Sequence, residues 1–200
     1  KEITARYTDF VSQPFQSQNR PALDYLDPKY TVPKSTVDRL AAIPGVKVDP
    51  RIFLETEVRE RPTIMIVEMR YFTIGDDRST PAVVFGVTPE LLTNNWMREG
   101  RTLNKTDKYS IVVGDSLASK ILASPFDQRV NVLGKDYQVV GVALDPINAG
   151  LVAYVPSETL VATANQTDYN LVLLKIDDSD PARTMESINE GLAGTGLQSI

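Results

Sequence analysis

The chain contains neither cysteine nor histidine in its 200 residues. The absence of cysteine excludes disulfide bonds and thiolate chemistry, and it suits an oxidising compartment in which a stray thiol would be a liability. The absence of histidine removes the commonest general base and the commonest metal ligand. We therefore expect no enzymatic activity, no cofactor and no metal site.

Long apolar runs are also missing, because no stretch approaches the ~20 residues that span a bilayer. No signal peptide is visible, since the chain opens with Lys1-Glu2 and a polar mixture. The chain also begins without methionine, so we expect it to be an excised piece of a longer protein.

Clustered positive charge is absent as well. The 21 basic residues are scattered, no run is longer than a pair, and the formal net charge is −5. Nucleic-acid binding requires a clustered basic footprint, and binding to an anionic membrane requires a polybasic patch. The sequence therefore argues against both kinds of partner.

What remains is an ordinary globular composition, with 42% hydrophobic and 24% charged residues. A chain of this length can bury a core as one domain or as two small lobes. The order of predicted elements is strand, helix, strand, then a long β-rich insert over roughly residues 60–165, then strand and helix. This order predicts an α+β fold, in which the two ends of the chain form one small α+β sandwich.

The first 33 residues differ from the rest. They hold five of the chain's 8 Tyr and 6 Phe residues, and they contain the prolines Pro14, Pro21, Pro28 and Pro33. We expect one short strand near Arg6–Val11, and then an irregular segment whose aromatic side chains fasten it to the body. The alternative is a partner-binding surface made of Tyr7, Phe10, Phe15, Tyr25 and Tyr30.

The two ends of the chain carry helix signals. Ser35 and Asp38 fit a capping box, and Pro44-Gly45 ends the helix that follows. A strand over residues 46–58 comes next. Near the other end, residues 169–176 read as an apolar strand, and Asp180 with Pro181 opens a last helix.

The insert reads mainly as strands. The expected strands cover residues 63–69, 81–87, 109–113, 129–133, 137–144 and 153–155. The strands over residues 129–133 and 137–144 are expected to form a hairpin with Gly134 in its turn. Gly75-Asp76-Asp77 reads as a loop, and helices are expected after Thr88 and over residues 116–122.

Acidic residues offer the only candidates for chemistry. The clusters Asp76-Asp77 and Asp177–Asp180 are expected to be structural or solvated loops, and the second lacks the spacing of a calcium loop. A weak calcium site is an open alternative. Glu55 and Glu57 share a strand face, which permits a carboxylate pair for hydrolysis. A ladder of exposed ion pairs is simpler, because acids and arginines alternate through Arg51, Glu55, Glu57, Arg59, Glu60, Arg61, Glu68 and Arg70. Ser116 and Lys120 could in principle form a serine nucleophile with its lysine base. Both residues instead fit the exposed side of an amphipathic helix.

Six segments carry a resemblance through their order and spacing, although none is specific alone: Leu40–Val46, Val84–Pro89, Glu99–Leu103, Ile111–Ala118, Val130–Val142 and Tyr154–Pro156. Together they resemble one known family, the MacB-like periplasmic core domains. The strand and helix near the end of the chain also fit. Residues 1–33 do not match, and Phe126-Asp127-Gln128 stands where the family pattern often has a glycine.

The resemblance implies two lobes. A porter-like α+β lobe would comprise residues 1–59 and 166–200, with 1–33 as an irregular aromatic-rich elaboration, and a β-rich sabre-like lobe would comprise residues 60–165. It also implies an extracytoplasmic domain of an ABC transporter permease of the MacB/FtsX/LolC type.

Such a domain would join two transmembrane helices of its permease, so both ends of the chain should lie on one side. The full-length protein would be dimeric and would work with a cytoplasmic ATPase, whereas the isolated domain could be a monomer. The implied roles are efflux, lipoprotein handling or signalling, with an extracytoplasmic protein partner also open. The alternative function is a free-standing secreted binding or adhesion module.

Overall fold

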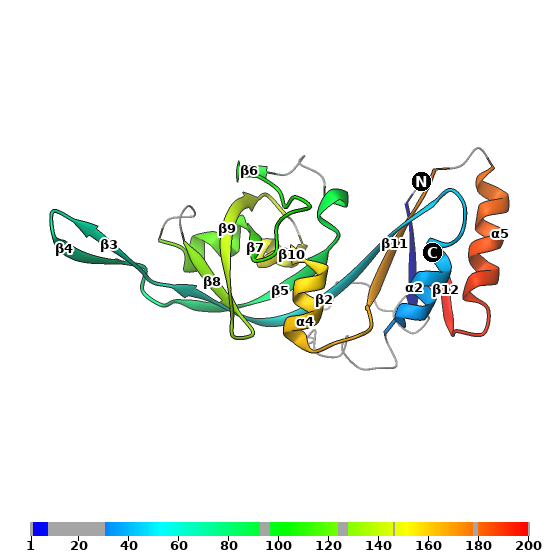
Figure 1. Cartoon of the computed structure of the whole chain (residues 1–200), viewed down its shortest axis with the longest axis horizontal. Helices are drawn as coiled ribbons and strands as arrows, with labels where there is room; N and C mark the ends of the chain where they lie inside the picture. The colour runs from blue at the N-terminus through cyan, green and yellow to red at the C-terminus, as the bar shows by residue number, and fades with distance from the viewer. Residues whose placement is uncertain are drawn as a thin grey trace. The chain divides into compact units, whose positions relative to one another are not determined.

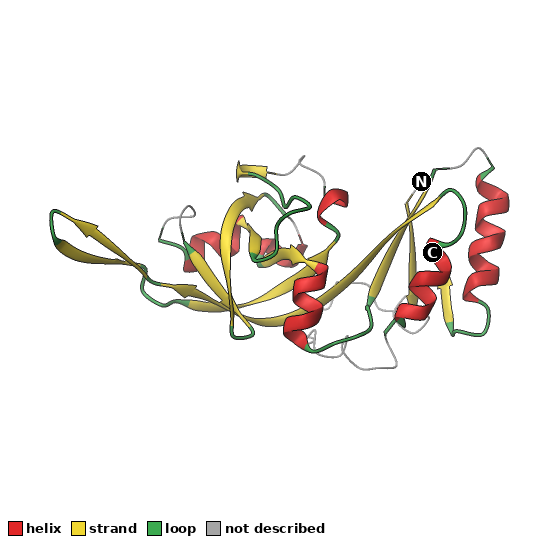
Figure 2. Ribbon diagram, in the orientation of Figure 1, coloured by secondary structure: helices red, strands yellow, loops and turns green. Residues whose placement is uncertain are grey.

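The computed structural model describes residues 2–7, 31–92, 97–123, 128–145, 147–177 and 180–199 (Figure 2). The chain separates into two compact units, Lys1–Leu54 with Asn165–Ile200 and Glu55–Ala164. The long strand β2 (Val46–Arg61) begins in the first unit and ends in the second.

The first unit contains a four-stranded antiparallel sheet. Its strand order is β12–β1–β11–β2, with β1 at Glu2–Tyr7, β11 at Leu171–Ile176 and β12 at Leu197–Ser199. Asn170 prolongs the ladder between β11 and β2. Its side chain accepts a hydrogen bond from the N–H of Phe53 and donates one to the Phe53 carbonyl, both at 2.8 Å.

Two helices, α2 (Lys34–Ala41) and α5 (Pro181–Leu192), cover one face of this sheet (Figure 1). Alternate residues along β11 point to the same face, because the side-chain period of a strand is two. That face is buried in one apolar cluster with both helices, formed by Val37, Leu40, Val172, Leu174, Ile176, Ile188 and Leu192. The first unit is therefore a two-layer α/β sandwich.

The second unit is built around a ring of six strands. Neighbours along the ring are β2, β5 (Ser79–Val87), β10 (Val152–Pro156), β7 (Ser110–Gly114), β9 (Lys135–Ala143) and β8 (Arg129–Val132). The ring closes because β8 pairs with both β9 and β2. Such closure makes a small barrel, and β6 (Met97–Gly100) adds to β9 outside the ring.

Short helices complete the second unit. Helix α3 (Asp115–Ile121) follows β7, helix α4 (Ser157–Ala164) follows β10, and both contact β5. A 3₁₀ turn, η3 (Pro89–Leu91), lies in one connection. Another connection contains η4 (Ile147–Gly150), a tight turn with positive φ at Asn148 and Ala149. Apolar side chains from all six ring strands are buried, among them Val58, Val84, Val112, Val130, Val139 and Val155.

A separate two-stranded hairpin belongs to the second unit but not to the ring. It consists of β3 (Thr63–Val67) and β4 (Arg70–Ile74), which pair antiparallel. Glu68 and Met69 form the turn, with φ of 49° and 62°. Positive φ at both turn residues is the type I′ geometry that suits a two-residue hairpin. The hairpin projects beyond the barrel, from the far ends of β2 and β5 (Figure 1).

Several sequence expectations need correction. The strand expected over residues 63–69 ends at Val67, because the chain turns back to form β4, which the sequence analysis missed. The strand β1 covers Glu2–Tyr7, so it overlaps the expected strand only at Arg6 and Tyr7, and residues 8–11 lie outside the described part. The helix expected after Thr88 is only a 3₁₀ turn.

Of the two predicted helix N-caps, the structure confirms one and contradicts the other. The capping box at Ser35 is wrong, because α2 starts at Lys34 behind Pro33 without a side-chain cap, and Asp38 instead pairs with Lys34 at 2.9 Å. The cap at Asp180 is confirmed, since its carboxylate accepts the N–H of Arg183 at 3.3 Å.

Candidate functional site

The aromatic surface expected near the start of the chain falls almost entirely outside the described residues. Tyr7 ends strand β1, which pairs with β11 and β12, and only its backbone is described. Phe10, Phe15, Tyr25 and Tyr30 lie outside the described part. Partner binding by these five residues therefore stays a prediction.

The acidic candidates that the structure describes do not converge on a site, and Asp178 lies outside the described part. Glu57 is exposed, Glu55 is half-buried, and Asp76 is largely exposed at 3.9 Å from Arg78. Asp177 pairs with Lys47 at 2.8 Å. Within the described ranges, no group of three or more acidic side chains could hold a metal ion.

The expected ion-pair ladder is only partly right. Two arginines of β2 do form exposed pairs, Arg59 with Asp77 at 3.7 Å and Arg61 with Asp136 at 2.9 Å. These acids come from a loop and from β9, however, and not from the neighbouring glutamates. Glu68 lies in the hairpin turn. Glu60 points into the unit and is buried.

Buried Glu60 joins separate segments of the second unit. Its carboxylate accepts hydrogen bonds from the N–H of Asp76 at 2.8 Å, the N–H of Ala123 at 3.1 Å and the side-chain amide of Gln128 at 2.9 Å. The guanidinium of Arg78 lies 3.6 Å away. Burial works to raise the pKa of Glu60, but these donors outweigh it and hold the pKa below its ordinary value. The carboxylate therefore stays ionised and holds these segments together, and it is not suited to act as a general acid.

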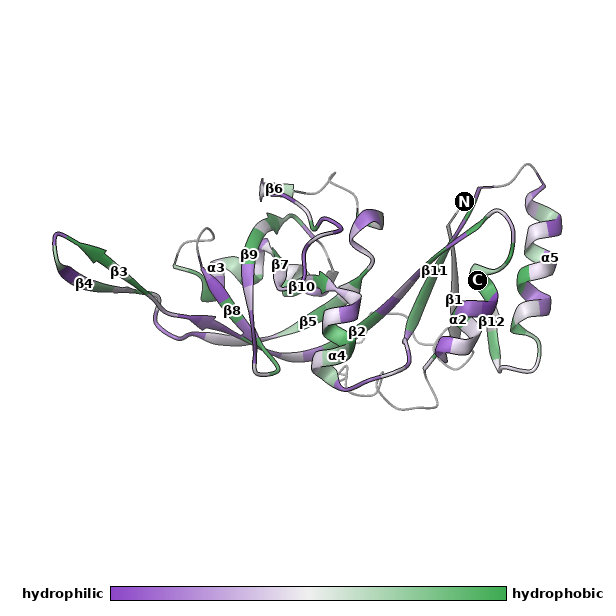
Figure 3. Cartoon of the chain, in the orientation of Figure 1, coloured by the Kyte–Doolittle hydropathy of each residue, from purple (hydrophilic) through white to green (hydrophobic). Residues whose placement is uncertain are grey.

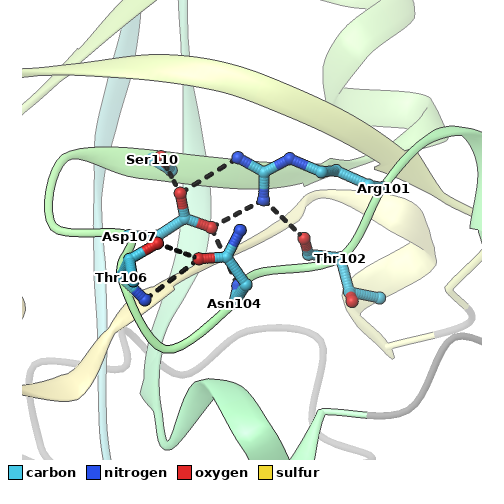
Figure 4. A network of polar contacts seen from close by, with 6 residues as sticks. All are labelled: Arg101, Thr102, Asn104, Thr106, Asp107 and Ser110. Carbon is cyan, nitrogen blue, oxygen red and sulfur yellow. Dashed lines mark hydrogen bonds and ion pairs between the residues drawn. The ribbon is translucent and has the colours of Figure 1, made fainter.

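A second carboxylate, Asp107, fastens the connection between β6 and β7 (Figure 4). Arg101 donates to both of its oxygens, at 2.6 and 3.0 Å. The N–H of Asn104 and the hydroxyl of Ser110 add bonds of 2.8 and 2.9 Å. Hydrogen bonding from Arg101 is the main cause that holds the pKa of Asp107 below its ordinary value. The network is structural, because these donors occupy both carboxylate oxygens.

Two glycines allow the backbones of β6 and β9 to approach closely. Gly100 and Gly141 are register partners in this strand pair. A Cβ on Gly100 would lie 2.4 Å from the Val140 carbonyl oxygen, and one on Gly141 would lie 2.3 Å from the Arg101 carbonyl oxygen. Both contacts are shorter than any real Cβ contact, so the pairing requires glycine at both positions.

An open depression of about 500 Å³ lies beside Tyr109 in the second unit. Lys135 sits over the Tyr109 ring with its ammonium 4.5 Å from the ring centre. The remaining lining consists of Arg129, Gly134, Asp136 and Gln138. This mixture of opposite charges in a shallow, open hollow selects no class of ligand.

The most distinctive surface of the described chain lies on the β3–β4 hairpin. Figure 3 shows hydrophobic colour along β3. We call this the hairpin surface, and it consists of the exposed side chains Ile64, Met65, Ile66, Val67, Met69, Tyr71 and Phe72. These side chains lie on both faces of the hairpin, and exposed apolar patches of this kind mark interaction sites on folded domains. Binding, rather than covalent chemistry, is what this arrangement can do.

Comparison with known proteins supports the resemblance in the sequence. The family model described as MacB-like periplasmic core domain matches residues 2–190. A search of curated proteins found no match.

Two solved structures share the fold. One is the periplasmic region of MacB from Actinobacillus actinomycetemcomitans, with a TM-score of 0.67 and 17% identity over 100% of this chain and 87% of that chain. The other is the extracellular domain of the noncanonic ABC-type transporter YknZ from Gram-positive bacteria, with a TM-score of 0.65 and 16% identity over 100% of both chains.

The family match covers nearly the whole chain, so the chain belongs to the MacB-like periplasmic core domains. It is a domain from the extracytoplasmic region of a MacB-like ABC transporter. No helix in the described ranges is long and apolar enough to cross a membrane. The family is a transporter domain and not a known class of enzyme.

The hairpin surface is the feature that sequence reasoning missed. Residues 70–74 read Arg-Tyr-Phe-Thr-Ile, and their aromatic and β-branched content is typical of a strand. The turn before them, Glu68-Met69, lacks the glycine or asparagine that normally identifies a type I′ turn. The strand signal alone could have found β4, but the turn signal could not.

Proposed function

We propose that this domain couples ATP hydrolysis by a cytoplasmic ATPase to movement or partner binding outside the membrane. The match of residues 2–190 to the transporter-domain family carries this proposal. In this role the domain serves efflux, lipoprotein handling or signalling. It works within a dimeric permease whose transmembrane helices flank it.

The two compact units support this role, since a transmitted motion requires parts that keep their own shape. We assign the porter-like lobe to residues 1–59 and 166–200 and the sabre-like lobe to residues 60–165. In the second unit, Glu60 joins three segments and Asp107 fastens the connection between β6 and β7, each through three or more hydrogen bonds. A closed strand ring with such anchors moves as a body rather than deforming.

The second unit can be removed to test the proposal. In the full-length permease, a short Gly-Ser linker would replace residues 55–164. We expect nucleotide binding by the ATPase to stay unchanged, while the variant fails to rescue the phenotype of a strain that lacks the permease. Membrane insertion of both versions is the control. Full rescue by the linker variant would contradict the proposal.

A further inference from the structure

The chain passes between its two units at two places. Leu54 is the last residue of the first unit before Glu55, and the chain returns from Ala164 to Asn165. Along the covalent chain, a movement of one unit reaches the other through these two connections. How firmly each connection is held to the sheet of the first unit therefore decides how much of that movement is passed on.

One connection is strand β2, and its backbone ladder with β11 ends before the boundary between the units. The last register partners are Arg51 and Leu171. If the register continued, Phe53 would face Tyr169, because partner numbers in an antiparallel pair change in opposite directions. Tyr169 pairs with Val32 instead, through backbone hydrogen bonds in both directions. The partner that the ladder would give to Phe53 is therefore engaged elsewhere.

The side chain of Asn170 takes that place. Its amide oxygen accepts the N–H of Phe53, and its amide nitrogen donates to the Phe53 carbonyl, both at 2.8 Å. The backbone N–H of Asn170 also donates to the Arg51 carbonyl at 3.2 Å. A side-chain amide supplies a donor and an acceptor side by side, as a peptide group does. Asn170 therefore carries the ladder on to Phe53, the residue before Leu54 at the boundary.

The surroundings of this amide are dry, so water cannot replace it. Asn170 is 6% exposed, and Ile52, Phe53 and Leu54 are 1%, 1% and 2% exposed. A buried backbone group that loses its hydrogen-bond partner is costly to keep in place. Without the amide, the stretch of β2 between its last anchor on β11 and the boundary would grow from Leu54 alone to Ile52–Leu54.

Asn170 belongs to the other connection. It lies in the segment that enters the first unit at Asn165 and continues into β11, whereas Phe53 lies in the strand that leaves this unit. The amide therefore joins the outgoing and the incoming connection directly to each other. A single strand can rotate about the φ and ψ bonds of each residue, and two strands that are joined restrict each other's rotation.

We propose that Asn170 is a positioning residue that couples the movements of the two units by clamping their two connections together. Hinges form where a few residues at the end of an element absorb changes in φ and ψ, and the clamp restrains β2 at such a place. A movement of the first unit is then passed to the second instead of being absorbed in the connections. This inference rests on the proposed function, in which the domain transmits movement outside the membrane.

Distances between two spin labels test the clamp in this chain alone. The sequence contains no cysteine, so Lys135→Cys in the second unit and Lys175→Cys in the first take the labels. Asn170→Leu keeps the approximate size of the side chain and removes its donor and its acceptor. We expect the distance distribution to become at least about twice as broad in this variant, because the released connections sample more conformations. Asn131→Leu is the matched control and should leave the distribution unchanged, since the Asn131 amide also accepts a backbone N–H, that of Gly134, but within the second unit.

Equal widths for the wild type and Asn170→Leu, or the same broadening in Asn131→Leu, would overturn the proposal. If Asn170→Leu does not fold, hydrogen exchange of the wild type decides. The Phe53 amide should exchange within about tenfold of the β2 amides that pair with β11, and a faster rate would overturn the clamp. Full rescue by Asn170→Leu in the permease, together with a broadened distribution, would contradict the proposed function and not the clamp, so the two failures are distinguishable.

Discussion

At the scale of single residues, two carboxylates stand out because each accepts three or more hydrogen bonds. Glu60 receives hydrogen bonds from a loop, from the end of α3 and from the residue before β8. Asp107 receives them from both ends of one connection. Hydrogen bonds to a charged group contribute about 1.5–3 kcal/mol each, more than neutral ones.

Glu60→Gln should lower the free energy of unfolding at pH 7 by about 2–3 kcal/mol, because a neutral amide supplies one acceptor where three donors converge. The pKa of Glu60 is depressed in the folded state, so its contribution is present above the ordinary value of 4.5 and is lost as the pH falls through the lower folded value. The variant should therefore lose less stability than the wild type below pH 4.5. Urea unfolding at a series of pH values measures both effects.

Glu57→Gln is the matched control for this prediction, since Glu57 lies on the same strand and is exposed. Its unfolding curves should overlay those of the wild type at pH 7. Equal losses for the two variants would show that Glu60 is not an anchor.

Gly100→Ala and Gly134→Ala distinguish two reasons for glycine, a positive φ alone and a positive φ combined with close approach of another backbone. Both residues have positive φ, 73° and 81°, but a Cβ on Gly134 meets nothing within 4 Å, whereas one on Gly100 strikes the Val140 carbonyl. We expect Gly134→Ala to cost about 1 kcal/mol from backbone strain alone, and Gly100→Ala to cost at least about 2 kcal/mol more. Thermal unfolding of the pair measures the difference, and equal costs would refute the close approach.

At the scale of elements, the hairpin is the least supported part of the second unit. Its two strands form a sheet of their own, and a two-stranded hairpin is only marginally stable in water. Its turn residues, Glu68 and Met69, adopt positive φ without being the residues that favour it.

Replacing Glu68-Met69 by Asn-Gly should therefore stabilise the hairpin by about 1 kcal/mol, because these residues adopt type I′ geometry with less strain. Hydrogen exchange of the cross-strand amides in β3 and β4 should slow by about fivefold, while amides of the barrel stay unchanged. Unchanged exchange in the hairpin would mean that the turn does not limit its stability.

Local chemistry explains which elements the sequence could predict. Asp180 with Pro181 is a strong helix start, and Gly134 marks the β8–β9 turn, so both were predicted correctly. The cap at Ser35 was predicted wrongly because the helix starts two residues earlier, at Lys34 behind Pro33. The Glu68-Met69 turn could not be predicted, because its conformation is imposed by strand pairing and not by its own residues.

At the scale of the whole molecule, the sequence predicted a mixed fold and the correct family, but not the closed ring. The ring depends on β8 pairing with β2, as in the partners Val58 and Val132, which lie far apart in the chain. Pairing at such separation leaves no local pattern. The burial of the Glu60 side chain could not be predicted for the same reason. Its hydrogen-bond donors come from segments that only folding brings together.

The proposed function requires this domain to move with the ATPase cycle of its permease. Spin labels at Lys135→Cys, an exposed site on the β8–β9 hairpin, would report the distance between the two copies of the full-length transporter. Labels at Lys34→Cys and Lys175→Cys, both within the first unit, provide the distance that should stay constant. We expect the Lys135 distance distribution to shift between the nucleotide-free and ATP-bound states. An identical distribution in both states, in a transporter that still hydrolyses ATP, would contradict it.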